Sequence, residues 1–212
     1  MVITYYGLSC FKISSGEFIL AFDPPSKKSS FKSPRFRADA VLISHAHVDH
    51  SGHDQISGKE NAAPVKIDGP GEYEIRGVDI SGIPSWHDEA NGKKLGSNTI
   101  YSAELENIKI CHLGDFGEKE LRNETLEAIG PVDILFLPIG GKTVIDAEAA
   151  SKIANQLEPK IIIPMHYEKK ELAVFLKESG IESSKPEEKL TVKKKELAED
   201  KTRVVILKPS IQ

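Results

Sequence analysis

The chain has 212 residues, a length typical of one domain, and we expect residues 1–212 to form a single domain. Hydrophobic residues make up 39% and charged residues 28% of the chain, which is typical of a globular protein and argues against disorder. The net charge of −4 argues against nucleic acid as a partner, although a local basic patch leaves it open. The sequence contains no apolar stretch of about 18 residues and no secretory leader, so we expect a cytoplasmic protein with no membrane partner.

The first half of the chain has the pattern of a β-rich region. Short apolar or alternating runs are separated by turn residues such as Ser15-Gly16, which predicts a hairpin. Strands are expected at 2–6, 10–14, 17–22, 39–44, 65–67, 72–75, 78–83, 98–103 and 109–113.

The second half alternates between helical and strand patterns. Helices are expected at 118–129, at 146–157 with Asp146 as N-cap, and at 168–179 before Gly180. Strands are expected at 132–137 and 160–163, and the runs 190–197 and 203–207 predict a final hairpin. A β-rich half followed by alternating helices and strands favours a layered sandwich with helices outside the sheets.

Three of the seven histidines fall within the six residues His45-Ala46-His47-Val48-Asp49-His50. Side chains two residues apart on extended chain project to the same side, so His45 and His47 can bind one ion. A turn after His47 would direct Asp49 and His50 to a second position, and imidazole and carboxylate groups suit Zn²⁺. The alternative is a solvated loop, but burying three histidines without metal would require several hydrogen-bond partners.

Further candidate residues follow expected strands. His87 and His166 are lone histidines, Asp115 lies in a Gly-Asp pair, and Asp23 lies in Phe22-Asp23-Pro24. Taken alone, His87 would be read as a surface histidine and His166 as a buried histidine bonded to the backbone. Their order relative to the 45–50 cluster is what makes them candidates.

With these residues in this order, the sequence resembles the metallo-β-lactamase superfamily. The similarity is to a small branch without a cap domain, made of metal-dependent hydrolases related to L-ascorbate-6-phosphate lactonase. The resemblance implies an α+β fold, a four-layer αββα sandwich with the site at one edge between two sheets. It implies metal-ligand roles for His45, His47 and His87 at one ion, for Asp49, His50 and His166 at a second, and for Asp115 as a bridge.

The implied cofactors are two divalent metal ions. Zinc is the default for such ligands, while manganese or iron also fits a site with two aspartates and no thiolate. The expected enzyme is a hydrolase whose metal-activated hydroxide attacks a carbonyl or phosphoryl group, with Asp49 steering the proton of the nucleophile. His112 is a candidate proton donor to the leaving group, or else a core histidine. Asp23 either orients a metal-binding imidazole or caps a turn.

Residues 26–37 contain five basic side chains and no acidic one. They form either a basic lip for an anionic substrate or a solvated loop. The leading hypothesis is hydrolysis of a small anionic molecule, a lactone or a phosphoester. The alternatives are a metal-dependent nuclease acting on RNA or DNA and a non-enzymatic metal-binding or sensing module. A homo-oligomer is compatible with the missing cap.

Overall fold

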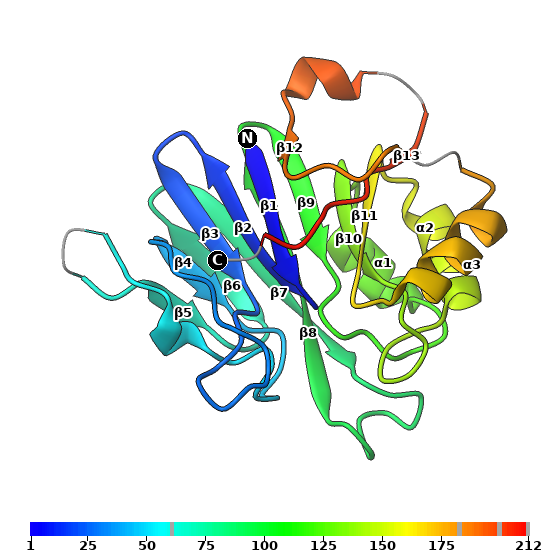
Figure 1. Ribbon diagram of the computed structural model, residues 1–212, viewed down its shortest axis with the longest axis horizontal. Coiled ribbons are helices and arrows are strands. Elements are labelled where there is room, and N and C mark those ends of the chain that lie inside the picture. The colour runs from blue at the N-terminus through cyan, green and yellow to red at the C-terminus, as the bar shows by residue number, and fades with distance from the viewer. Residues whose placement is uncertain (60–61, 182–183, 199–200, 211–212) are drawn as a thin grey trace.

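Two mixed β-sheets pack face to face in the computed structural model, which describes residues 1–59, 62–181, 184–198 and 201–210 (Figure 1). In spatial order, the first sheet consists of β12 (Leu190–Thr191), β1 (Val2–Gly7), β2 (Cys10–Ser15), β3 (Phe18–Phe22), β4 (Ala40–Leu42) and β5 (Val65–Ile67). The second consists of β13 (Arg203–Val204), β11 (Ile161–Met165), β10 (Ile134–Pro138), β9 (Ile108–His112), β8 (Ser97–Leu105), β7 (Val78–Trp86) and β6 (Gly71–Ile75).

The main hydrophobic core lies between the two sheets. Successive strand residues point to opposite faces, so alternate residues such as Leu20 and Phe22 of β3 meet Phe136 of β10 in this core. The intervening residues of β10, Leu135 and Leu137, pack in a second core beneath the helices. Strand β10 is therefore buried on both faces, which explains its uninterrupted apolar sequence.

Three helices cover the outer face of the second sheet: α1 (Asn123–Ile129), α2 (Ala147–Leu157) and α3 (Lys169–Ser179) (Figure 1). The carboxylate of Asp146 accepts a hydrogen bond from the Ala149 amide at 2.9 Å, so the expected N-cap of α2 is present. Helix α1 is shorter than expected. Residues 118–122 do not continue it, because Glu118 accepts a hydrogen bond from the Trp86 amide and anchors this segment to β7.

The outer face of the first sheet carries a smaller cluster of apolar residues. Ala21 and Val41 pack there against Ala38 and Ile56, which lie outside the sheet. Within the described ranges, this side is covered by loop segments and the short 3₁₀ helix η1 (His53–Gln55). The expected α+β sandwich is thus confirmed, with a mainly non-helical layer over this sheet.

The expected final hairpin is wrong. Strand β12 pairs antiparallel with β1 and β13 pairs parallel with β11, so the two segments extend the edges of different sheets. Between them lies the 3₁₀ helix η2 (Lys194–Leu197). Each segment pairs with the edge strand of a sheet that lies far from it in the sequence. Two apolar runs in the local sequence do not specify such a pairing. The predicted β2–β3 hairpin is present, with Ser15 opposite Phe18.

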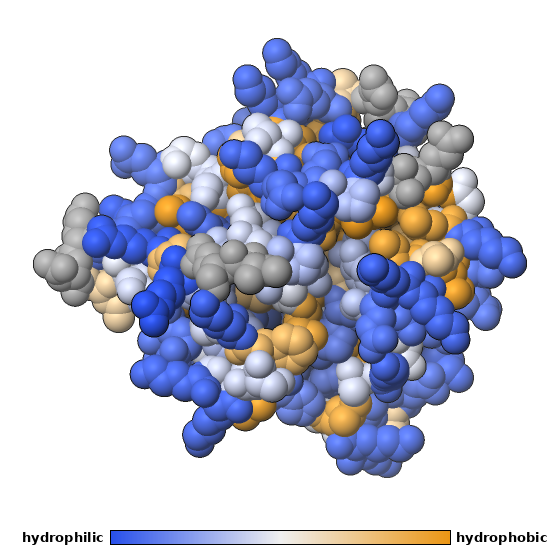
Figure 2. Space-filling model, viewed as in Figure 1, coloured by the Kyte–Doolittle hydropathy of each residue, from blue (hydrophilic) through white to orange (hydrophobic). Residues whose placement is uncertain are grey.

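Hydrophilic side chains cover most of the face shown in Figure 2, with a hydrophobic area over α3. In the described part of the chain, the helices are too short or too polar to cross a membrane. Cys10 and Cys111 are both buried and free.

Candidate metal centre

The predicted ligands converge because they follow strands that end at the same edge of the sandwich. His45 follows β4 of the first sheet, while Asp115 follows β9 of the second. His87 and His166 come directly after β7 and β11. The backbone of His166 has a φ of 54°, a left-handed conformation that turns the chain sharply at the end of β11. The predicted ligands therefore lie on loops that begin at the ends of buried strands, which position these loops.

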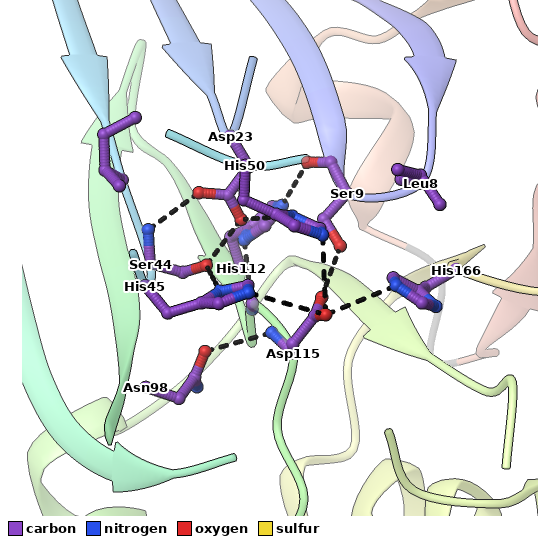
Figure 3. Close-up of polar contacts among 12 residues, drawn as sticks. Leu8, Ser9, Asp23, Ser44, His45, His50, Asn98, His112, Asp115 and His166 are labelled. Atoms are coloured by element: carbon purple, nitrogen blue, oxygen red, sulfur yellow. Dashed lines mark hydrogen bonds and ion pairs between the residues drawn. The ribbon is translucent and has the colours of Figure 1, made fainter. Parts of the chain in front are cut away.

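One carboxylate oxygen, Oδ2 of Asp115, lies at the centre of the cluster (Figure 3). Its distances to imidazole Nε2 atoms are 3.7 Å for His45, 3.5 Å for His50, 3.5 Å for His87 and 3.3 Å for His166. These separations exceed those of good N–H···O hydrogen bonds. Four ring nitrogens thus surround one carboxylate oxygen with room for ions between them.

Six of the seven predicted ligands fall into two groups in which the candidate ligand atoms lie within 4.8 Å of one another. A third group within the same limit joins Asp23 to His45 and His50, while the two groups of predicted ligands are His45, His47 and His87, and His50, Asp115 and His166. They match the two ligand sets that the resemblance implies, apart from Asp49. Asp49 lies outside them and is half-buried, and its Oδ1 accepts a hydrogen bond from the Ser29 hydroxyl at 2.5 Å. The metal-ligand role of Asp49, like that of the other six residues, stays a prediction.

The chemistry of the cluster fits divalent metal ions. Buried ring nitrogens of His45, His50 and His87 have no hydrogen-bond partner within the described ranges. Leaving buried polar atoms unpaired is costly, and metal coordination would satisfy them. Imidazole and carboxylate donors without a thiolate suit zinc, manganese or iron.

Ser44 links Asp23 to His45. The Ser44 hydroxyl donates to Asp23 Oδ2 at 2.6 Å, and it lies 2.9 Å from His45 Nδ1 (Figure 3). Because the single proton of the Ser44 hydroxyl goes to the carboxylate, the hydroxyl oxygen accepts a hydrogen bond from Nδ1–H of His45. The Nε2 lone pair of His45 therefore faces Asp115. The Ser44 amide also donates to Asp23 Oδ1 at 2.7 Å. Asp23 thus reaches the predicted ligand His45 through Ser44, which fits the first of its two expected roles.

Asp115 is held by two groups that the sequence did not indicate. The Ser9 hydroxyl donates to its Oδ1 at 2.9 Å, and its backbone amide donates to Oδ1 of Asn98 at 3.0 Å. Burial raises the pKa of Asp115, but the neighbouring His50 and His166 outweigh burial and hold this pKa well below its usual range. Ser9 lies in a turn and Asn98 in a strand, and neither has a sequence motif that marks such a role.

The electrostatics favour the neutral imidazole at His45 and His87 but not at His50. Burial, followed by the charge of His50, lowers the pKa of His45 to about 3. Burial likewise lowers the pKa of His87. Burial also opposes protonation of His50, but Asp115 and then Asp23 outweigh it and raise its pKa. Burial and the carboxylates of Asp115 and Asp23 thus act in opposite directions on the pKa values of these histidines.

His112 is fully buried, and its ring stacks on Phe22 with centroids 4.6 Å apart. Its Nδ1 accepts a hydrogen bond from the Gly114 amide at 3.1 Å, so its Nε2 donates to the Ser9 carbonyl at 3.0 Å. Both ring nitrogens are occupied by backbone groups. This geometry favours a core histidine over the proton donor that was the other expectation.

The basic segment 26–37 lies beside the ligand loop. The Ser26 amide donates to the Val48 carbonyl at 2.9 Å, and Ser29 contacts Asp49 as described above. The expected position near the rim of the site is therefore present. Whether the segment contacts substrate stays a prediction.

This fold and ligand cluster define a metal-dependent hydrolase of the metallo-β-lactamase type. A sequence profile described as "Beta-lactamase superfamily domain" matches residues 2–166. The UPF0173 metal-dependent hydrolase of Thermococcus onnurineus is 31% identical, covering 98% of this chain and 96% of its own. A metallo-β-lactamase superfamily protein of Thermotoga maritima, a solved structure, has a TM-score of 0.79 and 32% identity, covering 98% of this chain and 99% of its own.

The chain belongs to the UPF0173 family of metal-dependent hydrolases, within the metallo-β-lactamase superfamily. The counterpart from Pyrococcus horikoshii is 32% identical and covers 98% of this chain and 96% of its own. The predicted superfamily, fold and enzyme class are thereby confirmed.

Proposed function

We propose that this chain is a two-metal hydrolase that cleaves a lactone or phosphoester bond in a small molecule. Zinc is the ion we expect, and manganese or iron is compatible with the ligands. The observation that carries the proposal is the position of Asp115 Oδ2, within 3.3–3.7 Å of four imidazole nitrogens. A single carboxylate oxygen among two ligand groups suits a bridge between two ions.

The ligands divide between the two positions. His45, His47 and His87 would hold one ion, and Asp49, His50 and His166 would hold the other. When bound, such ions lower the pKa of water towards about 7 and polarise the substrate oxygen.

The remaining chemistry comes from the side chains of the protein. Asp23 and Ser44 keep His45 in the tautomer that presents Nε2 to the site. Ser29 donates a hydrogen bond to the Asp49 carboxylate, and this carboxylate would take the proton of the attacking water. Neither Cys10 nor Cys111 would serve as the nucleophile, because both are buried and burial raises the pKa of both thiols.

The test is hydrolysis of two chromogenic substrates, a phosphodiester and a lactone, by the zinc-loaded protein and by its His47→Ala variant. We expect the wild type to cleave one substrate and the variant to lose at least about 100-fold in kcat/KM, since one ion loses a ligand. His53→Ala, which removes a nearby histidine from outside the ligand groups, is the matched control. Full activity of His47→Ala would refute the proposal.

A nuclease is the second candidate, and the position of the basic segment beside the ligand loop favours it. Such binding to RNA or DNA weakens steeply as salt rises. Absence of binding to single-stranded RNA and duplex DNA at low salt would eliminate this candidate.

A further inference from the structure

Three cavities lie beside one another next to the metal cluster, and Phe31 lines all three. The largest, of about 520 Å³, also borders the predicted ligand His166. The smallest, of about 130 Å³, shares Pro209 with the largest and Lys32 with the third, which has about 320 Å³. The three cavities therefore form one groove that begins at the metal cluster and continues past Phe31.

A serine hydroxyl connects Phe31 to the metal cluster. Ser29 Oγ accepts a hydrogen bond from the Phe31 amide at 2.9 Å and donates one to Asp49 Oδ1 at 2.5 Å. The Ser26 amide donates to the Val48 carbonyl at 2.9 Å, so a second bond holds this segment against the ligand loop. The backbone of Phe31 is therefore held beside the cluster, while 47% of the residue is exposed to solvent and available for contact.

The part of the groove nearest the metal cluster has an apolar lining. The Leu8 carbonyl, in its wall, accepts a hydrogen bond from the His166 amide at 3.0 Å and joins this wall to a predicted ligand. Lys142, Glu168 and Glu171 border the same cavity, and the first two form an exposed ion pair that solvent screens. An apolar group of a ligand would fit here, because the apolar lining residues are Leu8, Phe31, Tyr167 and Pro209.

The cavity at the far end of the groove is basic. Lys27, Lys32 and Arg35 line it together with four serine residues, and in the part of the chain that the structure describes no carboxylate lines it. Asp54 lies near Lys27, whose charge contributes to lowering the pKa of Asp54 after the larger effect of a hydrogen bond with Gln55. One carboxylate thus offsets part of the charge of three cations. Cationic side chains and hydroxyl donors suit an oxyanion.

We propose that the substrate spans this groove, with an apolar ring packed on Phe31 beside the metal cluster and an anionic group bound in the basic cavity. The inference rests on the proposed function, since it places the bond to be cleaved at the metal ligands near His166. The anionic group is remote from this bond and serves recognition, not reaction. The substrate is then a small molecule that carries both an apolar ring and a negative charge.

Compounds without a hydrolysable bond test this inference without relying on catalysis. Three are needed: a phenylalkyl sulfonate, the phenylalkanol without the charge, and the alkyl sulfonate with a methyl group in place of the ring. Each is made with linkers of three and of six carbons, and NMR titration of the zinc-loaded protein measures each Kd. At the better linker length, we expect loss of the sulfonate or of the ring to weaken binding at least about 5-fold.

Variants assign each group of the probe to its cavity. Lys27→Ala/Lys32→Ala should weaken both sulfonates at least about 5-fold and leave the phenylalkanol unchanged. Phe31→Ala should weaken both phenyl compounds by about 5-fold and leave the alkyl sulfonate nearly unchanged. Raising salt from about 50 to about 500 mM should weaken only the sulfonates.

Matched controls remove the same chemistry elsewhere. Lys189→Ala/Lys195→Ala removes two exposed lysines that flank β12, which pairs with the end of β1 away from the metal cluster. Val65→Ala removes an exposed apolar side chain from β5. Both controls should bind all three compounds as the wild type does. Zinc content and unfolding midpoint confirm that each variant is folded and loaded.

Equal Kd values for the sulfonate and the alkanol, wild-type affinity in Lys27→Ala/Lys32→Ala or in Phe31→Ala, or no binding of any compound would overturn the inference. Tighter binding of a single-stranded decanucleotide than of the phenylalkyl sulfonate would assign the groove to a nucleic acid and also overturn it. Hydrolysis of the two chromogenic substrates is measured separately. If the compounds bind as expected but neither substrate is cleaved, the proposed function fails while the groove stands; cleavage without binding in the groove gives the reverse.

Discussion

The hydroxyl of Ser9 donates a hydrogen bond to Oδ1 of Asp115 at 2.9 Å, across 106 positions of the sequence. This bond occupies one carboxylate oxygen and leaves Oδ2 to face the four imidazoles. Ser9 lies in the turn between β1 and β2 of the first sheet, whereas Asp115 follows β9 of the second. The metal centre is therefore tied to both sheets through a residue that is not itself a ligand.

Ser9→Ala should lower metal affinity by about 10-fold, because hydrogen bonds to ligands fix their orientation. Competition with a chromogenic chelator measures the affinity. Ser14→Ala, a serine of β2 away from the centre, serves as the control. Equal affinities of wild type and Ser9→Ala would show that this bond does not orient Asp115.

Ser44→Ala should act on both stability and metal binding. It removes the hydroxyl that bonds to the buried Asp23 and fixes the His45 tautomer, at a cost of about 1–3 kcal/mol in unfolding free energy. Metal affinity should fall by about 10- to 100-fold. Urea unfolding of the metal-free protein and chelator competition separate the two effects. An unchanged metal affinity would argue against a role for Ser44 in presenting His45.

Gly140→Ala tests the close approach between the loop after β10 and the ligand His166. A Cβ at this position would lie 2.2 Å from the His166 carbonyl oxygen, so the loop must shift. We expect a loss of about 1–3 kcal/mol in stability together with weaker metal binding. At Gly69 a Cβ would meet nothing within 4 Å, which makes Gly69→Ala the matched control. Equal behaviour of the two variants would contradict this account.

Removing the metal should lower thermal stability. The buried ring nitrogens bind ions only when the chain is folded, so free metal at 100 times Kd stabilises by about 2.7 kcal/mol. For a chain of this size, this corresponds to a decrease in Tm of about 5–10 °C on adding a chelator. His47→Ala, which loses a ligand, should show a smaller shift in scanning calorimetry. A Tm that does not respond to the chelator would argue against binding at this cluster.

The two thiols should be unreactive in the folded protein. Burial raises the pKa of Cys111 to about 12, and burial followed by the charge of Asp23 raises that of Cys10 well above its usual value. A thiolate is the reactive form, so an aromatic disulfide reagent should label both only on unfolding. Rapid labelling at neutral pH in native buffer would contradict the observed burial.

Much of the architecture is predictable because hydrophobic periodicity records which face of each element is buried. Strands β1 to β11 lie where alternation or apolar runs indicate them, and the Asp146 cap marks the start of α2. The pairing of β12 and β13 with separate sheets is not predictable in this way, because local runs do not specify distant edges. Helix α1 is shorter than the helix expected at 118–129, because Glu118 accepts a hydrogen bond from the Trp86 amide of β7.

The residues that form the candidate metal site are predictable from the sequence, because His45, His47 and His50 lie close together in it and the other members follow expected strands. The residues that support the ligands are not. Ser9 and Asn98 have common side chains in ordinary local contexts, and only the packing of the two sheets brings them to Asp115. His112 lies close to Asp115 in the sequence, which made it a candidate for the site. Both of its ring nitrogens are instead hydrogen-bonded to backbone groups.

In the proposed hydrolase, Asp115 would lie between two metal ions held by this cluster. The most direct test is the metal content of zinc-loaded, dialysed protein by plasma mass spectrometry, beside Asp115→Asn and the remote N-cap control Asp146→Asn. We expect two ions per chain for the wild type and for Asp146→Asn, and one ion or fewer for Asp115→Asn. One ion or fewer in the wild type, or two retained by Asp115→Asn, would contradict it.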